Sequence, residues 1–94
     1  MVKTMAARLR IYGRVQGVGY RAWLIRIAEA RGIDGWARNR ADGSVEALLH
    51  GDPEMVQAVV ERCHRGPRLA RVDRIEQAPD GSVPDRGFVQ RPTA

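Results

Sequence analysis

Cysteine is almost absent from this chain, because Cys63 is the only one among 94 residues. One cysteine excludes an internal disulfide and a zinc site built from several cysteines, and it favours a cytoplasmic protein. Long apolar runs are also missing, and none approaches the roughly 20 residues that a membrane helix needs. The first eight residues have no apolar stretch of signal-peptide length. The sequence therefore predicts a cytoplasmic location and no membrane association.

Lysine is nearly as scarce, since Lys3 is the only one and the other 15 of the 16 basic residues are arginine. Against 11 acidic residues this leaves a net charge of +5. One interpretation is a compositional bias towards arginine. The other is attraction of an anionic partner, either a phosphate compound or a nucleic acid. Composition alone does not decide between them.

The length and composition are those of one small globular domain, which we expect to span residues 1–94. Hydrophobic residues make up 44% and charged residues 29% of the chain, as in a folded protein. The spacing of apolar residues and the turn residues predict strands over Ala7–Tyr12, Gly35–Arg40, Ser44–His50 and Leu69–Gln77. They predict helices over Tyr20–Arg31 and from Asp52–Pro53 to Gly66. A short edge strand is expected over Gly87–Arg91. This order, βαββαβ with one extra strand, predicts an α+β ferredoxin-like sandwich. Its two helices would cover one face of an antiparallel sheet.

The apolar residues of each predicted element fall on one side. The helical periods select Leu24, Ile27 and Ala28 in the first helix and Val56, Val59, Val60 and Cys63 in the second. Because Cys63 falls on this apolar side, we expect it to pack in the core and not to act as a reactive thiol. Alternation in the strand over Ser44–His50 leads us to expect Glu46 to face solvent.

The segment Gly13–Gly19 joins a predicted strand to a predicted helix and contains three glycines. Glycines let backbone amides converge on a small anion, and the start of a helix adds free N–H groups and a positive dipole. Arg21, in the first helical turn, could clamp a phosphate with two hydrogen bonds. The alternative is a glycine-rich connection without a ligand.

The glycine-rich segment fits neither of two nucleotide-binding motifs well. Gly17, Gly19 and Ala22 match a G-x-G-x-x-A pattern, but the chain is too short for two nucleotide-binding halves and no acidic residue ends the next strand. The G-x-x-x-x-G-K-[ST] sequence of a P-loop is absent. Neither motif is therefore the favoured interpretation.

Asn39 precedes the predicted Asp42-Gly43 hairpin, where its amide could hold a water molecule or simply shape the turn. His50 and His64 have no metal-ligand spacing. No metal site is predicted.

Two longer patterns resemble the motifs of the acylphosphatase family. The first, G-x-V-Q-G-V-x-[FM]-R, is met by Gly13, Val15, Gln16, Gly17, Val18 and Arg21, with Tyr20 in place of the usual residue. The second, around a strand and hairpin, is met by Gly35, Trp36, Asn39, Gly43, Val45 and Gly51. The resemblance covers about residues 7–91. Gln90 departs from it, because the family's last strand usually has an apolar residue there.

The resemblance implies hydrolysis of acyl phosphates, with Arg21 as the phosphate-binding catalytic residue and Asn39 orienting the attacking water. It implies a phosphate cradle formed by Val15, Gln16, Gly17, Val18, Gly19 and Tyr20. It further implies no cofactor, no metal and no covalent intermediate. Inorganic phosphate would be product and inhibitor, and the protein would act as a monomer.

Two other functions stay open at this point. A nucleic-acid-binding module can share the ferredoxin-like topology, although it would stack bases on exposed aromatic residues of the sheet, and this chain has few. The other is a partner-dependent domain that binds carbamoyl phosphate, since acylphosphatase-like domains of that kind occur at the start of much larger hydrogenase-maturation proteins.

Overall fold

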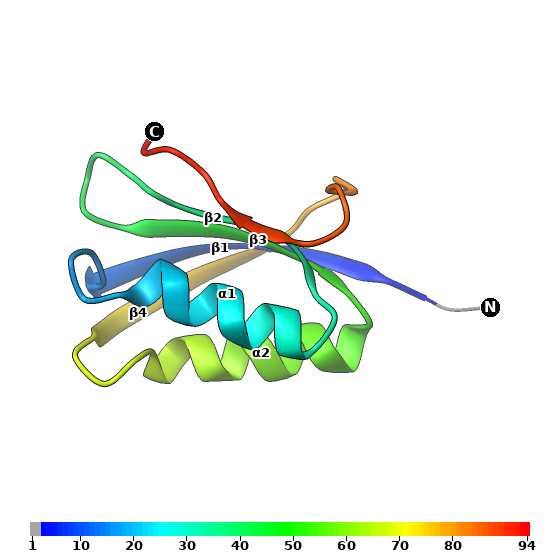
Figure 1. The fold of residues 1–94 in the computed structure, drawn as a ribbon, viewed down its shortest axis with the longest axis horizontal. Helices are drawn as coiled ribbons and strands as arrows, with labels where there is room; N and C mark the ends of the chain where they lie inside the picture. Colours follow the sequence, from blue (N-terminus) through cyan, green and yellow to red (C-terminus); the bar gives the residue numbers. More distant parts are fainter. Residues whose placement is uncertain (1–2) are drawn as a thin grey trace.

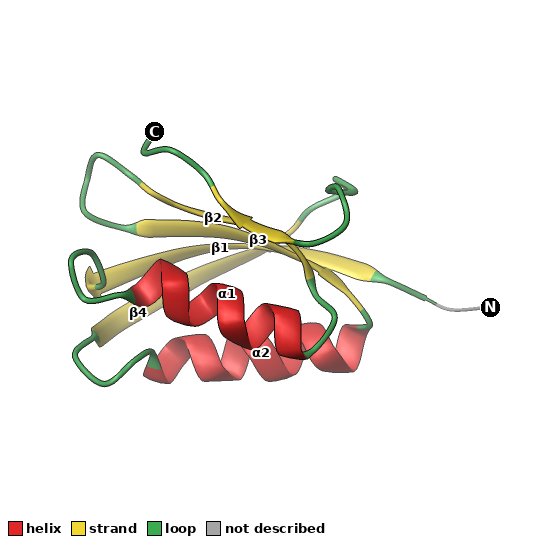
Figure 2. Cartoon of the chain, in the orientation of Figure 1, coloured by secondary structure: helices red, strands yellow, loops and turns green. Residues whose placement is uncertain are grey.

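A computed structural model describes residues 3–94, which form a five-stranded sheet and two helices (Figure 1). In chain order the elements are β1 (Met5–Arg14), α1 (Tyr20–Ala30), β2 (Asp34–Asn39), β3 (Val45–Gly51), α2 (Pro53–Arg65), β4 (Arg71–Pro79) and β5 (Phe88–Gln90). Both helices lie on the same face of the sheet (Figure 2). The predicted ferredoxin-like order and layering are therefore confirmed.

The strand order across the sheet is β4-β1-β3-β2-β5. The pairs β1–β3, β1–β4 and β2–β3 are antiparallel, as predicted. β5, however, pairs in parallel with β2, so the sheet is mixed where an antiparallel one was expected. The parallel pairing arises because the chain after β4 crosses from one edge of the sheet to the other, where β5 lies. β5 starts at the end of the sheet where β4 stops, so it runs against β4 and along β2.

The core lies between the helices and the sheet, and each helix buries the stripe that its sequence period predicted. The buried helical residues are Tyr20, Leu24, Ile27 and Ala28 in α1 and Val56, Val59, Val60 and Cys63 in α2. They pack against alternate residues of the central strands, among them Leu9, Ile11, Ala47 and Leu49. α2 begins as expected, because Asp52 Oδ1 accepts a hydrogen bond from the Glu54 N–H at 2.9 Å and Pro53 follows it.

The strand after α2 starts two residues later than predicted. The Ala70 N–H donates to Pro67 O at 3.0 Å, which closes a turn over the residues between them. Leu69 lies in that turn with 68% of its surface exposed, and β4 begins at Arg71. The apolar character of Leu69 therefore suggested a strand position that the turn prevents.

Glu46 is buried, contrary to the expectation that it faces solvent. Only 6% of its surface is exposed, because β3 is central and its neighbours place arginines beside it. Its carboxylate contacts Arg38 at 2.8 Å, Arg8 at 3.1 Å and Arg40 at 3.2 Å. Burial by itself would raise the pKa of Glu46. The hydrogen bond and charge of Arg38, with the charges of Arg40 and Arg8, hold that pKa below its usual value.

Arginines also cover the aromatic ring on the face of the sheet without helices. The guanidinium groups of Arg91, Arg38 and Arg8 lie 4.8, 4.9 and 5.4 Å from the ring centre of Trp36. Trp36 is only 5% exposed, so its ring is not free to stack a base as the nucleic-acid hypothesis requires. Across the described residues, neither helix has the length and apolar character needed to cross a membrane.

Candidate active site

The loop between β1 and α1 owes its shape to glycines with positive φ. Gly17 and Gly19 have φ of 74° and 79°, which other residues rarely adopt. A Cβ placed on either would meet no atom of residues 3–94 within 4 Å, so both border open space in the described part of the chain. At Gly13 the constraint is contact, because a Cβ there would lie 2.1 Å from Arg71 O in the neighbouring strand.

The start of α1 is open to an anion. Gly19 is the N-cap and supplies no side-chain hydrogen bond, and the first turn contains no acidic residue. The first N–H groups of a helix have no partner within the helix, and they carry the positive end of its dipole. Arg21 adds a permanent positive charge in the same turn.

A pocket of about 150 Å³ lies where this loop meets the ends of β2 and β5. It is lined by Val15, Gln16, Gly17, Gly19, Tyr20, Arg21, Ala22, Asn39 and Gln90. The pocket thus brings Arg21 and Asn39 together, although they lie 18 positions apart in the sequence. Every residue of the predicted cradle except Val18 lines it, and the Val18 side chain packs against the core.

The side chain of Gln16 joins the glycine loop to the hairpin that follows Asn39. Its Nε2 donates to Arg40 O and to Ser44 O, each at 2.8 Å. The Arg40 N–H also donates to Ser44 O at 2.8 Å. Gln16 therefore binds the two residues, Arg40 and Ser44, whose hydrogen bond closes the hairpin. The role predicted for Gln16 involved only its backbone N–H, as part of the cradle. The side chain has a second task, which is to fix the distance between the two halves of the pocket.

Asn39 ends β2, and its side-chain oxygen is unsatisfied. Asn39 Oδ1 is buried and accepts no hydrogen bond from any described residue. Leaving a buried acceptor unpaired costs about 1–3 kcal/mol, so such an atom calls for a donor from a bound molecule. Asn39 is also one of the residues that line the pocket, so the pocket is the nearest described space from which a donor could come.

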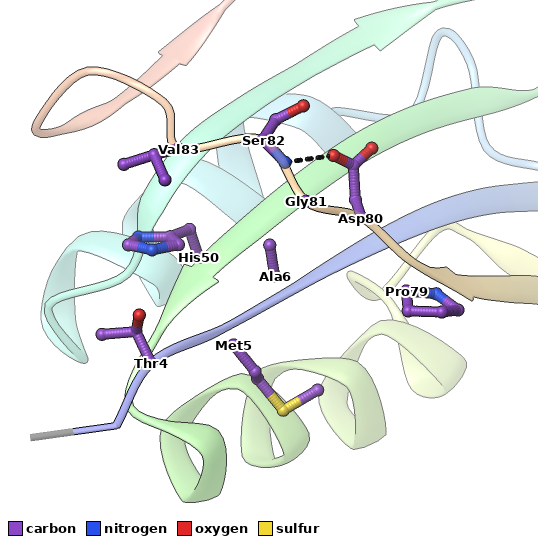
Figure 3. A pocket seen from close by; sticks show the side chains of 9 residues that line it. All are labelled: Thr4, Met5, Ala6, His50, Pro79, Asp80, Gly81, Ser82 and Val83. Atoms are coloured by element: carbon purple, nitrogen blue, oxygen red, sulfur yellow. Dashed lines mark hydrogen bonds between the residues drawn. The ribbon is translucent and has the colours of Figure 1, made fainter.

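A larger hollow of about 360 Å³ lies at the other end of the sheet, where β1 begins (Figure 3). Thr4, Met5, His50 and Asp80 are among its lining residues, and the Ser82 N–H donates to Asp80 Oδ1 at 2.7 Å. It contains none of the residues predicted for the site. Among residues 3–94, no three His, Cys, Asp or Glu side chains are grouped so that they could hold a metal ion.

Comparison with known proteins identifies the family. A family model described as acylphosphatase matches residues 7–90. The chain belongs to the acylphosphatase family. It is 46% identical over 89 residues to an acylphosphatase of Rhizorhabdus wittichii, which covers 95% of this chain and 90% of that protein. An acylphosphatase of Thermococcus kodakarensis is 52% identical over 83 residues, which cover 85% of this chain and 91% of that protein.

Solved structures agree with this assignment. The crystal structure of acylphosphatase from Bacillus subtilis superimposes with a TM-score of 0.87 at 33% identity, covering 93% of this chain and 98% of that one. The protein is therefore an enzyme of the acylphosphatase type.

The structure also shows what Tyr20 does at the position where this acylphosphatase-family chain departs from the usual motif. The Tyr20 hydroxyl donates to Cys63 O at 2.6 Å, so the residue that replaces a phenylalanine or methionine supplies a hydrogen bond to α2. Ala22 and Gln90 line the pocket but were not predicted to do so. The helical position of Ala22, one residue after Arg21, was a signal for it. Gln90 gave none, because its place depends on the pairing of β5 with β2.

Proposed function

We propose that this protein hydrolyses the bond between the carboxyl and phosphoryl groups of acyl phosphates, giving a carboxylate and inorganic phosphate. The observation that carries the proposal is the unsatisfied oxygen of Asn39 in the same pocket as Arg21 and the glycine loop. An anion site and a water site side by side are what this hydrolysis needs.

The phosphoryl group would bind where positive partners converge. Backbone N–H groups of residues 15–20 would face its oxygens, and the start of α1, which has no side-chain cap, would add its dipole. The Arg21 guanidinium donates two hydrogen bonds to phosphoryl oxygens, and these strengthen as charge develops on them. Removal of one such donor typically slows an enzyme about 10²–10³-fold.

The attacking water would bind Asn39. Oδ1 accepts one water O–H, which leaves a lone pair free to attack phosphorus. As the new P–O bond forms, the bond to the acyl oxygen breaks, and its electron pair leaves with the carboxylate. The water proton passes to a phosphoryl oxygen. Because a carboxylate is a good leaving group, this reaction needs positioning and charge stabilisation more than a strong acid or base.

Kinetics of three variants test the proposal. We expect the purified protein to hydrolyse benzoyl phosphate and acetyl phosphate in the presence of a chelator, with competitive inhibition by phosphate. Arg21→Ala should lower turnover about 10²–10³-fold and weaken phosphate inhibition, whereas Asn39→Ala should mainly lower kcat. Arg26→Ala is the matched control, because Arg26 lies on the exposed part of the same helix.

Two results would contradict it. One is a wild-type protein that releases no phosphate even at high enzyme concentration, with or without the chelator. The other is an Asn39→Ala variant with full kcat, which would remove the role in holding water. Arg21→Lys should not restore activity, because an ammonium group lacks the planar fork of a guanidinium.

The cytoplasmic location, monomeric state and single-domain organisation expected from the sequence are also part of the proposal. The monomer is tested by size-exclusion chromatography, in which we expect a species near 10.5 kDa.

A further inference from the structure

Gln90 lies beside the end of β2, in the wall of the same pocket. It pairs with Ala37 in the parallel β2–β5 ladder. The next N–H, of Arg91, donates to Ala37 O at 2.9 Å, and the N–H of Ala94 donates to Asn39 O at 3.1 Å. The main chain after Gln90 is therefore fastened along the last residues of β2.

Strand alternation gives the direction of the two side chains. Phe88 points into the core and is 4% exposed, whereas Val89 points away and is 53% exposed. Gln90 therefore points to the same side as Phe88. In β2, Ala37 belongs to the core, so Asn39 also points to that side. The side chains of Asn39 and Gln90 thus lie on the same side of the sheet, and both residues line the pocket.

A water molecule held by Asn39 and one phosphoryl oxygen would have two polar partners, the lower end of the usual two to four. For attack, one lone pair faces phosphorus and one O–H faces a phosphoryl oxygen. The second O–H is taken by Asn39 Oδ1, the acceptor that lacks a partner. The remaining lone pair can accept a third hydrogen bond that fixes the water further, and a carboxamide N–H can donate it.

We propose that Gln90 is a further catalytic residue, whose Nε2–H donates to the attacking water held by Asn39. The proposal rests on the proposed function. In an in-line displacement the water and the leaving carboxylate lie on opposite sides of phosphorus. Since Asn39 and Gln90 lie on the same side of the sheet and line the same pocket, Gln90 lies on the side of the water, away from the acyl group.

The test is the kinetics of Gln90→Leu on two substrates with different acyl groups. We expect kcat to fall about five- to tenfold, the value of one hydrogen bond, and by the same factor for benzoyl phosphate and acetyl phosphate. KM and the inhibition constant of phosphate should stay unchanged. Gln90→Glu should lose kcat as well, because an ionised carboxylate has no N–H to donate. Gln57→Leu, on the exposed side of α2, is the matched control and should match the wild type.

A double variant tests whether the two amides hold the same water. If they do, Gln90→Leu should cost much less in an Asn39→Ala background than in the wild type. The proposal is wrong if the two losses multiply, if Gln90→Leu keeps full kcat, or if it changes the ratio of the two substrates or the inhibition by phosphate. A wild type without hydrolytic activity would instead overturn the proposed function.

Discussion

Removal of the Tyr20 hydroxyl should destabilise the protein more than its single hydrogen bond suggests. Tyr20 is 1% exposed and its hydroxyl donates to Cys63 O, in the last turns of α2. A helical carbonyl normally accepts from the N–H four residues later, but here that residue is Pro67, which has none. Tyr20→Phe would therefore leave a buried acceptor without a partner.

The expected loss of stability follows from that geometry. An unsatisfied buried acceptor costs about 1–3 kcal/mol, and the phenylalanine ring retains the packing. Burial, followed by the nearby Cys63, raises the pKa of Tyr20 above its usual value, so the hydroxyl remains a donor in neutral and mildly alkaline solution.

Urea unfolding of two matched variants measures the loss. With an m-value of about 1–2 kcal/mol/M, Tyr20→Phe should lower the unfolding midpoint by roughly 1 M. The chain's other tyrosine, Tyr12, is the control, since its hydroxyl contacts the exposed Glu76 at 3.0 Å. Tyr12→Phe should change the free energy of unfolding by less than about 0.5 kcal/mol. Equal stability of Tyr20→Phe and the wild type would refute the reasoning.

Two further predictions concern buried groups. Glu46→Gln should lower the free energy of unfolding by about 1–3 kcal/mol at neutral pH, because three arginines lose their shared carboxylate. The folded-state pKa of Glu46 lies below its usual 4.5. Its contribution is therefore present above about that pH and lost as the pH falls through the folded-state value, so unfolding curves of variant and wild type should converge in acid. Burial raises the pKa of Cys63 to about 12, and a thiol reagent at mildly alkaline pH should label Cys63 only when denaturant is added. Rapid labelling of the folded protein would contradict the burial of Cys63.

Much of the fold could be predicted because the relevant signals are local. The stripe from Val56 to Cys63 and the cap at Asp52 each lie within a few residues, so period and turn chemistry were enough to place α2. The same holds for the Gly17 and Gly19 loop, whose positive φ only glycine adopts readily.

The wrong or missing predictions depend on contacts between distant segments. Glu46 is buried because Arg8 and Arg38 come from neighbouring strands, which alternation within one strand does not reveal. The parallel direction of β5 depends on where β4 stops. The position of Gln90 depends in turn on the pairing of β5 with β2. The hydroxyl of Tyr20 matters because Pro67 has no N–H to donate to Cys63 O. Tyr20 and Pro67 lie far apart in the sequence, so no local pattern relates them.

The measurement that tests the central claim most directly is the rate of phosphate release from benzoyl phosphate by the wild type and by Arg21→Ala, at equal concentration and in chelator. We predict steady hydrolysis by the wild type and a fall of about 10²-fold or more in the variant. Equal rates for the two proteins, or no release by either, would contradict the claim that the pocket between the glycine loop and Asn39 hydrolyses acyl phosphates.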